Sequence, residues 1–158
     1  TQRGYTTFEE YSRTLMKAGQ KAGTVNLFSS SPTEFSQELL KGRKQQFDKA
    51  NQYPAQNKVV FYDRGMHDTY AYLKAIGKAT TTWEESVFQY QYDLVFLVSP
   101  WQEIYTKDAE RLETFDQAKM YYPFIKEAYK RQHEIIEVPQ FSISQRITFI
   151  ESHIKTYG

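Results

Sequence analysis

The sequence predicts an α/β fold: a three-layer domain in which a parallel sheet carries helices on both faces. Two observations support this. Short segments rich in β-branched and aromatic residues alternate along the chain with segments of helical periodicity, and this alternation is typical of parallel strands joined by right-handed crossovers. The two most apolar of the strand segments, residues 58–62 and 94–98, are apolar on both faces, as expected for strands covered on both sides by helices.

Three segments are predicted strands because each is β-branched or aromatic and is followed by residues that break regular structure. They are residues 58–62, 94–98 and 134–138. A weaker fourth candidate is residues 5–8. We therefore expect the sheet to contain at least these segments, with residues 51–57 forming a polar loop before one of them.

Helix-start signals precede five segments with helical periodicity. The clearest is Ser31-Pro32-Thr33-Glu34, which offers a capping hydroxyl, a proline at the first helical position and a capping-box glutamate. That helix should run to about Lys49. The others should span residues 68–76, which Asp68 could cap, then 82 to before 93, 114 to about 132, and 142 onwards. Pro123 should kink or interrupt the fourth helix, and the last should turn four isoleucines inward: Ile143, Ile147, Ile150 and Ile154.

Composition bounds the function. The 158 residues (18.7 kDa) suit a single domain with one core. Lys and Arg total 20 against 19 Asp and Glu, so no net field attracts nucleic acid and any anion site must be local. The longest apolar run, Leu94–Val98, is too short to span a membrane. The absence of cysteine excludes thiolate metal sites and cysteine nucleophiles, suits a reducing compartment, and leads us to expect a cytoplasmic location.

Candidate site residues follow the strands, because ligands of open parallel sheets bind outside the carboxyl ends. Asp63-Arg64-Gly65 follows residues 58–62. The carboxylate could hold the water shell of Mg²⁺ or position a hydroxyl, and the guanidinium could grip a phosphate. The alternative is an ion pair that closes the strand, with Gly65 serving the turn.

Glu9 and Glu10 follow the weaker strand, together with Arg13. Because neighbours on a strand point in opposite directions, at most one of the two glutamates enters a cleft, where it could be a general base or a second-shell metal ligand. A solvated charge at a helix entry is the alternative. On the helix that starts near Ser31, Arg43 and Gln46 share one side and could address a substrate phosphate and a ring edge, or could form a wet helix face.

A polar connection after residues 94–98 could be a lid. Residues 100–114 are long enough for one and contain Lys107, Asp108, Glu110 and Arg111. A lid arginine such as Arg111 could close over transferring phosphates. Alternating charges on a solvated turn are the competing interpretation.

Two other kinds of site are not supported. The three histidines lack the spacing and the carboxylate partners of a metal site. Residues 76–80 contain Gly-Lys, but a phosphate-binding loop of the form Gly-x-x-x-x-Gly-Lys-[Ser/Thr] would need Gly at Tyr72 and a hydroxyl at Ala79.

Several blocks in order resemble one family: the AAA-like P-loop NTPase domains grouped with the nicotinamide riboside kinase domain and, more distantly, with thymidylate and deoxynucleoside kinases. The blocks are residues 3–13, 38–46, 59–65, 100–105 with 108–111, and 134–139. In that family a strand, a P-loop and a helix precede the first block. The resemblance therefore implies that residues 1–158 are a single P-loop NTPase-like domain lacking its N-terminal strand and P-loop, with roughly 20 to 25 residues expected upstream.

The resemblance also implies roles for individual residues. Asp63 would lie near Mg²⁺ and the acceptor, Arg64 would bind a substrate phosphate, and Arg111 would be the lid arginine. Glu9 or Glu10 would take the place of the base of nucleoside kinases. Three further side chains would line the acceptor pocket, namely Arg13, Arg43 and Gln46. The missing first strand is central in such sheets, so its absence should leave a gap lined by apolar side chains.

These interpretations lead to one principal hypothesis: an ATP-binding P-loop protein, kinase-like, that moves a phosphoryl group to a nucleoside, nucleotide or similar small acceptor with Mg²⁺. GTP could replace ATP. One alternative is a nucleotide-dependent switch or binding module with slow hydrolysis and a protein or lipid partner. A remnant that binds no triphosphate is a third possibility.

Overall fold

The computed structural model describes residues 3–23, 30–54, 59–104 and 114–157. All four predicted strand segments contain a strand within these residues. The strands are β1 (Thr6–Phe8), β2 (Val60–Tyr62), β3 (Val95–Leu97) and β4 (Ile135–Glu137). Each is three residues long, so each predicted segment was placed correctly and drawn one or two residues too long.

The strands form two separate parallel pairs. The sequence predicts instead a single parallel sheet as the middle layer of a three-layer domain. β1 pairs with β2, with Thr6 opposite Val60, and β3 pairs with β4, with Val95 opposite Ile135. The Asp63 N–H donates to the Phe8 carbonyl at 2.9 Å. The parallel direction is as predicted, but within the described residues no strand joins the two pairs.

Five of the six α-helices that the structure describes coincide with predicted segments. Those five are α3 (Pro32–Asn51), α4 (Met66–Ala75), α5 (Thr81–Phe88), α6 (Phe115–Lys130) and α7 (Ile143–Tyr157). A 3₁₀ turn, η1 (Gln102–Ile104), follows β3. The sixth helix, α1 (Tyr11–Lys21), was not predicted. Its apolar stripe of Leu15 and Met16 is short, and a helix entry at Glu9-Glu10 was considered only as the alternative interpretation of that pair.

Four details of the helix predictions are corrected. Asp68 is not the cap of α4, because the helix begins at Met66 with Gly65 as N-cap. The Ser31 hydroxyl makes no capping bond, although Ser31 occupies the N-cap of α3. Pro123 does not interrupt α6, which runs through it. Ile143 is 70% exposed, so the first turn of α7 does not face the core as predicted.

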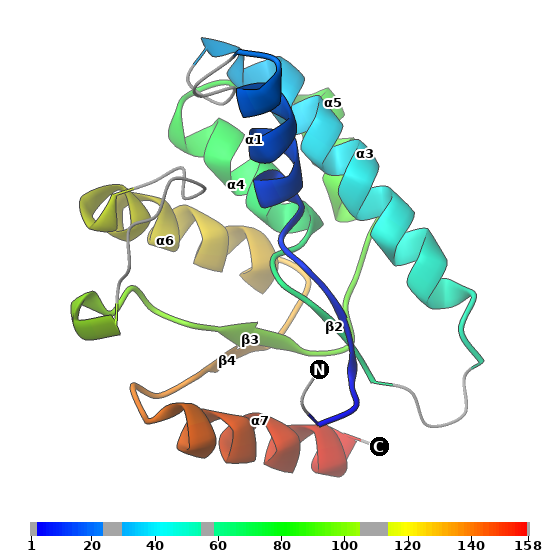
Figure 1. The fold of residues 1–158 in the computed structure, drawn as a ribbon, viewed down its shortest axis with the longest axis vertical. Helices are drawn as coiled ribbons and strands as arrows, with labels where there is room; N and C mark the ends of the chain where they lie inside the picture. The colour runs from blue at the N-terminus through cyan, green and yellow to red at the C-terminus, as the bar shows by residue number, and fades with distance from the viewer. Residues whose placement is uncertain (1–2, 24–29, 55–58, 105–113, 158) are drawn as a thin grey trace.

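The helices pack on both sides of the strands (Figure 1). α6 covers one side of the β3–β4 pair and α7 lies on the other side, which gives this part of the molecule three layers. α4 packs against both α6 and α3, and α1 packs against α3. The main core lies where α4 meets α5 and α6, around Met66, Tyr70 and Val87.

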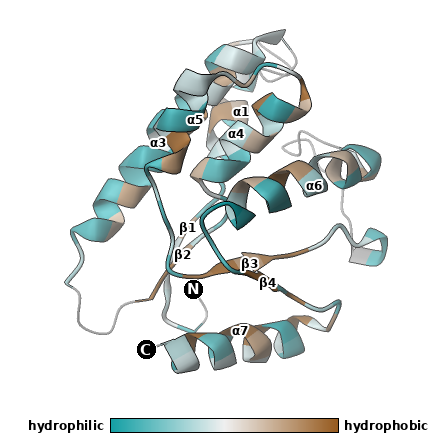
Figure 2. Cartoon of the chain, turned by 180° about the vertical axis from the view of Figure 1, so that it is seen from behind, coloured by the Kyte–Doolittle hydropathy of each residue, from teal (hydrophilic) through white to brown (hydrophobic). Residues whose placement is uncertain are grey.

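Hydropathy follows this arrangement. Figure 2 shows β3 and β4 among the most hydrophobic parts of the molecule, whereas much of the surface of α3 and α7 is hydrophilic. This distribution is expected when strands are enclosed and helices face water on one side. Among the described residues, no helix is both long enough and apolar enough to cross a bilayer.

Candidate functional site

The carboxyl ends of β1 and β2 lie next to each other because the two strands are parallel and in register. The chain leaves β1 through Glu9 and Glu10 into α1, and it leaves β2 through Asp63, Arg64 and Gly65 into α4. Side chains that are more than 50 residues apart in the sequence therefore meet at one edge.

Asp63 is the first residue after β2 and lies at this edge. Its side chain is exposed at the surface, yet the surrounding atoms desolvate the carboxyl enough to raise its pKa. Arg64 and Arg13 oppose this rise, whereas the charges of Glu10 and Asp68 add to it. The Asp63 carboxylate thus reaches the surface beside the guanidinium groups of Arg64 and Arg13.

Arg64 has a left-handed backbone conformation with φ 67°, the one positive φ among the described non-glycine residues. Its Nη1 lies 3.4 Å from Oδ1 of Asp68 and also donates to the Tyr72 hydroxyl. The side chain remains 33% exposed. Positive φ is strained for an arginine, and residues held in strained conformations are concentrated at functional sites.

Asp68 lies directly beneath Arg64 and is buried. Its Oδ2 accepts hydrogen bonds from the Gly65 N–H at 3.0 Å and from the Tyr129 hydroxyl. Burial would raise the pKa of the Asp68 carboxyl, but Arg64, Arg43 and these two donors hold it below its usual value. Asp68 is therefore an ionised carboxylate inside the protein at neutral pH.

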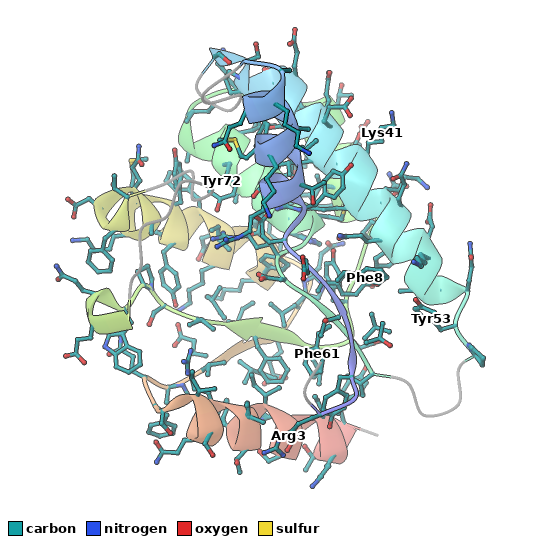
Figure 3. The ribbon with its side chains drawn as sticks, in the orientation of Figure 1. Arg3, Phe8, Lys41, Tyr53, Phe61 and Tyr72 are labelled. Atoms are coloured by element: carbon teal, nitrogen blue, oxygen red, sulfur yellow. The ribbon has the colours of Figure 1, made fainter. Side chains whose placement is uncertain are left out.

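Arg43 is also buried, only 3% exposed, and its guanidinium is engaged within the protein. Nη2 forms an ion pair with Oε1 of Glu10 at 3.0 Å, and Nη1 donates to the Thr69 hydroxyl at 2.9 Å. Figure 3 shows Lys41, two residues earlier on α3, pointing away from the molecule. Arg43 thus links α3 to α1 and α4, and its Nε is its one nitrogen without a partner among the described residues.

Glu10 and Glu9 point in different directions, although neither residue lies in β1 as the sequence argument assumed. Glu10 turns inward, where it caps α1 by accepting from the Ser12 N–H at 3.1 Å, whereas the Glu9 side chain is exposed. The Gln46 side chain donates to the Glu9 backbone carbonyl at 3.1 Å, so it joins α3 to the end of β1.

The remaining predicted residues are placed unequally. Arg13, in the first turn of α1, is close enough for its charge to act on Asp63. Arg111 and most of the predicted lid lie outside the described residues, as do Lys107, Asp108 and Glu110. The structure thus brings together Glu10, Asp63 and Arg64, with Arg13 and Arg43 beside them.

The described residues contain no group of three or more His, Cys, Asp or Glu side chains that could hold a metal ion. This finding does not conflict with the predicted Mg²⁺ site, because Mg²⁺ commonly binds one or two carboxylates and keeps several waters. Asp63 fits that mode, since its oxygens are hard ligands and reach the surface.

A family model described as "AAA domain" matches residues 1–146. The chain belongs to this AAA domain family. It is therefore a P-loop NTPase-like domain of a nucleotide-binding family, as the sequence blocks indicate. A search of curated proteins finds no match. In this AAA domain the match covers every element from β1 to the start of α7, including both strand ends that form the site.

Sequence reasoning missed the buried residues of the AAA domain site, which are Asp68 and Tyr129, together with the partly buried Tyr92. Asp68 was interpreted only as a helix cap, and neither Tyr129 nor Tyr92 was predicted as a site residue. A local signal existed for Asp68, because Arg64 and Asp68 have the i, i+4 spacing of a helical ion pair. No local signal existed for Tyr129, which reaches Asp68 from α6 across 61 residues of sequence.

Proposed function

We propose that this AAA domain is the larger part of an ATP-binding, kinase-like phosphotransferase that uses Mg²⁺ and acts on a nucleoside, nucleotide or similar small acceptor. The observation that carries the proposal is the pairing of Asp63 and Arg64 at the end of β2. An exposed carboxylate with a raised pKa stands beside an arginine in a strained backbone conformation, which is a combination that stability alone does not favour.

Each partner has a role in the proposed reaction. The bond between the γ-phosphorus of ATP and its bridging oxygen breaks, a bond forms from that phosphorus to an acceptor hydroxyl oxygen, and ADP leaves. The hydroxyl proton passes to a carboxylate at the rim, and the guanidinium of Arg64 neutralises charge on a phosphate. Mg²⁺ bound near Asp63 would neutralise charge on the phosphates.

Of the predicted acidic residues, Asp63 is best placed for this role. Glu10 is committed to Arg43 and to the cap of α1, and a carboxylate held by a cation is a weaker base. Glu9 is exposed and stays an alternative base. Arg13, Arg43 and Gln46 stay predicted acceptor-pocket residues, although Arg43 would contact a ligand only through Nε or after rearrangement. Arg111 stays the predicted lid arginine.

The P-loop would follow a strand that pairs in parallel with both β2 and β3. The Asp63 N–H points to β1, so the N–H and C=O of Tyr62 point the opposite way. By the same alternation, those of Phe96 point away from β4, because Leu97 accepts from Val138. Among the described residues no strand pairs with either of these inner edges, which supports the proposal that one further strand, followed by the P-loop, completes the sheet.

The ligand test uses the complete gene product. Thermal unfolding is measured with Mg²⁺-ATP, with Mg²⁺-GTP and with a panel of nucleosides and nucleoside monophosphates. A kinase should be stabilised by the triphosphate and separately by an acceptor. Selective stabilisation by one triphosphate with no response to any acceptor would favour the nucleotide-dependent switch over the kinase, and no response to either triphosphate would contradict nucleotide binding.

The site test compares turnover of Asp63→Asn with that of the wild type once an acceptor responds. We expect a loss of at least about a hundredfold, because the carboxylate acts on the transition state. Asp116→Asn is the matched control, since that side chain is 89% exposed in an ion pair with Lys119 on α6. Near-normal turnover of Asp63→Asn would remove this residue from the proposed machinery.

A further inference from the structure

Arg64 would bind a phosphate well only if its guanidinium were held in a fixed direction, and the structure shows what holds it. The acidic partner is Asp68, one helical turn further along, with Nη1 of Arg64 at 3.4 Å from Oδ1. We propose that Asp68 is a positioning residue, which orients the Arg64 guanidinium toward a phosphate at the rim of the site. This inference rests on the proposed phosphate-binding function and deepens it.

The carboxylate of Asp68 is itself immobilised. Oδ2 receives the Gly65 N–H at 3.0 Å and the Tyr129 hydroxyl, which leaves Oδ1 facing Arg64. The residue is 4% exposed, so water does not compete for these bonds. A buried carboxylate anchored by the N-cap of its own helix and by a tyrosine of α6 is a fixed reference point for the arginine, whereas an exposed partner would move with it.

The same guanidinium nitrogen of Arg64, Nη1, is also held by Tyr72 on α4, labelled in Figure 3. The Tyr72 hydroxyl accepts a hydrogen bond from Nη1 of Arg64, and the Tyr72 ring packs edge-on against Tyr121 of α6 at 4.8 Å between centroids. Asp68 and Tyr72 therefore constrain Arg64 from two successive turns of one helix, while 33% of the Arg64 side chain stays exposed.

The backbone at residues 64 and 65 supports the same interpretation. The left-handed conformation is less favourable for an arginine than for a glycine, so the Arg64 side chain must contribute something that a glycine cannot. At Gly65, a Cβ atom would lie 2.6 Å from the Tyr129 hydroxyl and 2.7 Å from the Tyr92 hydroxyl. The turn is therefore fixed by the same tyrosine that fixes Asp68.

The start of α4 does not offer a competing phosphate site. The Gly65 N–H is taken by Asp68, and the Met66 N–H donates to the Tyr92 hydroxyl at 3.0 Å. Amide groups already bonded to side chains are not available to an anion. A phosphate at this end of β2 would thus depend on the guanidinium of Arg64, and so on the group that orients it.

The experiment measures binding of Mg²⁺-ATP and of inorganic tripolyphosphate to the complete gene product by calorimetry. Four proteins are compared: wild type, Asp68→Asn, Arg64→Gly and the double variant. Asparagine keeps an acceptor for Gly65 but loses the charge that attracts Arg64, and glycine keeps the left-handed backbone. We expect each single variant to bind about tenfold more weakly, the equivalent of about 1.4 kcal/mol. The double variant should bind no more weakly than Arg64→Gly.

That non-additivity distinguishes positioning from general loosening of the fold. If the losses multiply in the double variant, or if Asp68→Asn binds like wild type, the proposal is wrong. Asp48→Asn is the matched control, because Asp48 forms an exposed i, i+4 ion pair with Lys44 on α3; it should bind normally.

Two further measurements cover other failures. If Asp68→Asn does not fold, Tyr129→Phe removes one bond that anchors the carboxylate and should weaken binding only when Arg64 is present; an equal effect in the Arg64→Gly background would overturn the proposal. If wild type binds neither probe, the proposed function fails instead. Nitrogen-15 NMR of the arginine side chains then decides the positioning claim alone, because Asp68→Asn should release the Arg64 guanidinium into fast rotation, and unchanged restriction would contradict it.

Discussion

The Glu10 carboxylate and the Arg43 guanidinium form an ion pair of 3.0 Å with both residues buried, and this pair joins the cap of α1 to the middle of α3. From the sequence, Glu10 was a candidate general base or second-shell metal ligand and Arg43 a candidate substrate-binding residue, whereas in the structure the two residues pair with each other. A buried pair of this kind stabilises little relative to an apolar pair, yet losing one member is costly because the other is left charged and unpaired.

Arg43→Met should therefore lower the free energy of unfolding by about 3–5 kcal/mol, because Glu10 is left uncompensated. Urea denaturation checks this value. The double variant Glu10→Gln with Arg43→Met should recover much of the loss, since no charge is then stranded. Lys44→Met, in the exposed pair with Asp48 on the same helix, should change stability by less than about 1 kcal/mol. Equal effects at positions 43 and 44 would contradict the buried-pair interpretation.

His67 should make the protein lose stability as the pH falls. It is fully buried, and burial lowers the pKa of its imidazole to about 4. Gln132 donates through Nε2 to the Phe88 carbonyl, so its Oε1 faces His67 and Nε2 of His67 carries the proton. Nδ1 has no partner among the described residues, so a proton added there would be buried without an acceptor.

The unfolded chain takes up a proton at His67 near its ordinary pKa of 6.5 and the folded protein only near 4. Between these two pH values the unfolded state binds more protons than the folded state. The free energy of unfolding therefore decreases as the pH decreases, by roughly 3 kcal/mol in all. Urea unfolding at pH 8, 6.5, 5 and 4 measures this slope. His67→Gln should flatten it between pH 6.5 and 4, and an unchanged slope would show that other groups cause the loss.

Gly42 should not tolerate a methyl group. A Cβ atom at this position on α3 would lie 2.0 Å from the Tyr11 ring of α1. Alanine is worth about 1 kcal/mol more than glycine inside a helix, but the overlap should outweigh this gain and leave Gly42→Ala less stable by about 1–3 kcal/mol. Thermal and urea unfolding give the sign.

The matched background is Tyr11→Leu, which removes the ring. There Gly42→Ala should raise stability instead, by up to about 1 kcal/mol, because only the helix preference remains. A loss of the same size in both backgrounds would mean that something other than Tyr11 excludes a side chain at Gly42.

Asp63→Asn should make the folded protein more stable at pH 7 while removing its proposed activity. Desolvation raises the pKa of Asp63 in the folded protein, so the ionised carboxyl opposes folding at neutral pH. The gain should shrink as the pH falls from 7 toward the ordinary aspartate pKa of 3.8, because wild-type Asp63 becomes protonated in the folded state first and then in the unfolded state. Melting temperatures of wild type and variant at pH 7 and pH 3.5 provide the comparison, and a destabilised variant at pH 7 would show that Asp63 serves the fold.

Local sequence patterns were sufficient for the elements that carry the site. The four strand segments were each recognised from a few β-branched or aromatic residues, and Asp63 and Arg64 were found because they follow one of them directly. Such patterns succeed because strand and helix preferences depend on neighbours within a turn or a pleat. α1 was not predicted because its buried face is small and the residues that precede it resembled the end of a strand.

The tertiary structure decided which of the predicted side chains are available for chemistry. Arg43 and Asp63 look equally exposed in the sequence, yet Arg43 is enclosed by Glu10 and Thr69 whereas Asp63 reaches the surface. Asp68 is held beside Arg64 in part by a hydrogen bond from the hydroxyl of Tyr129, a residue on another helix. The amino-acid order by itself determined the α/β class, the strand ends and the family; the burial of each charge depended on contacts between distant segments, because desolvation and pairing arise only when the chain is packed.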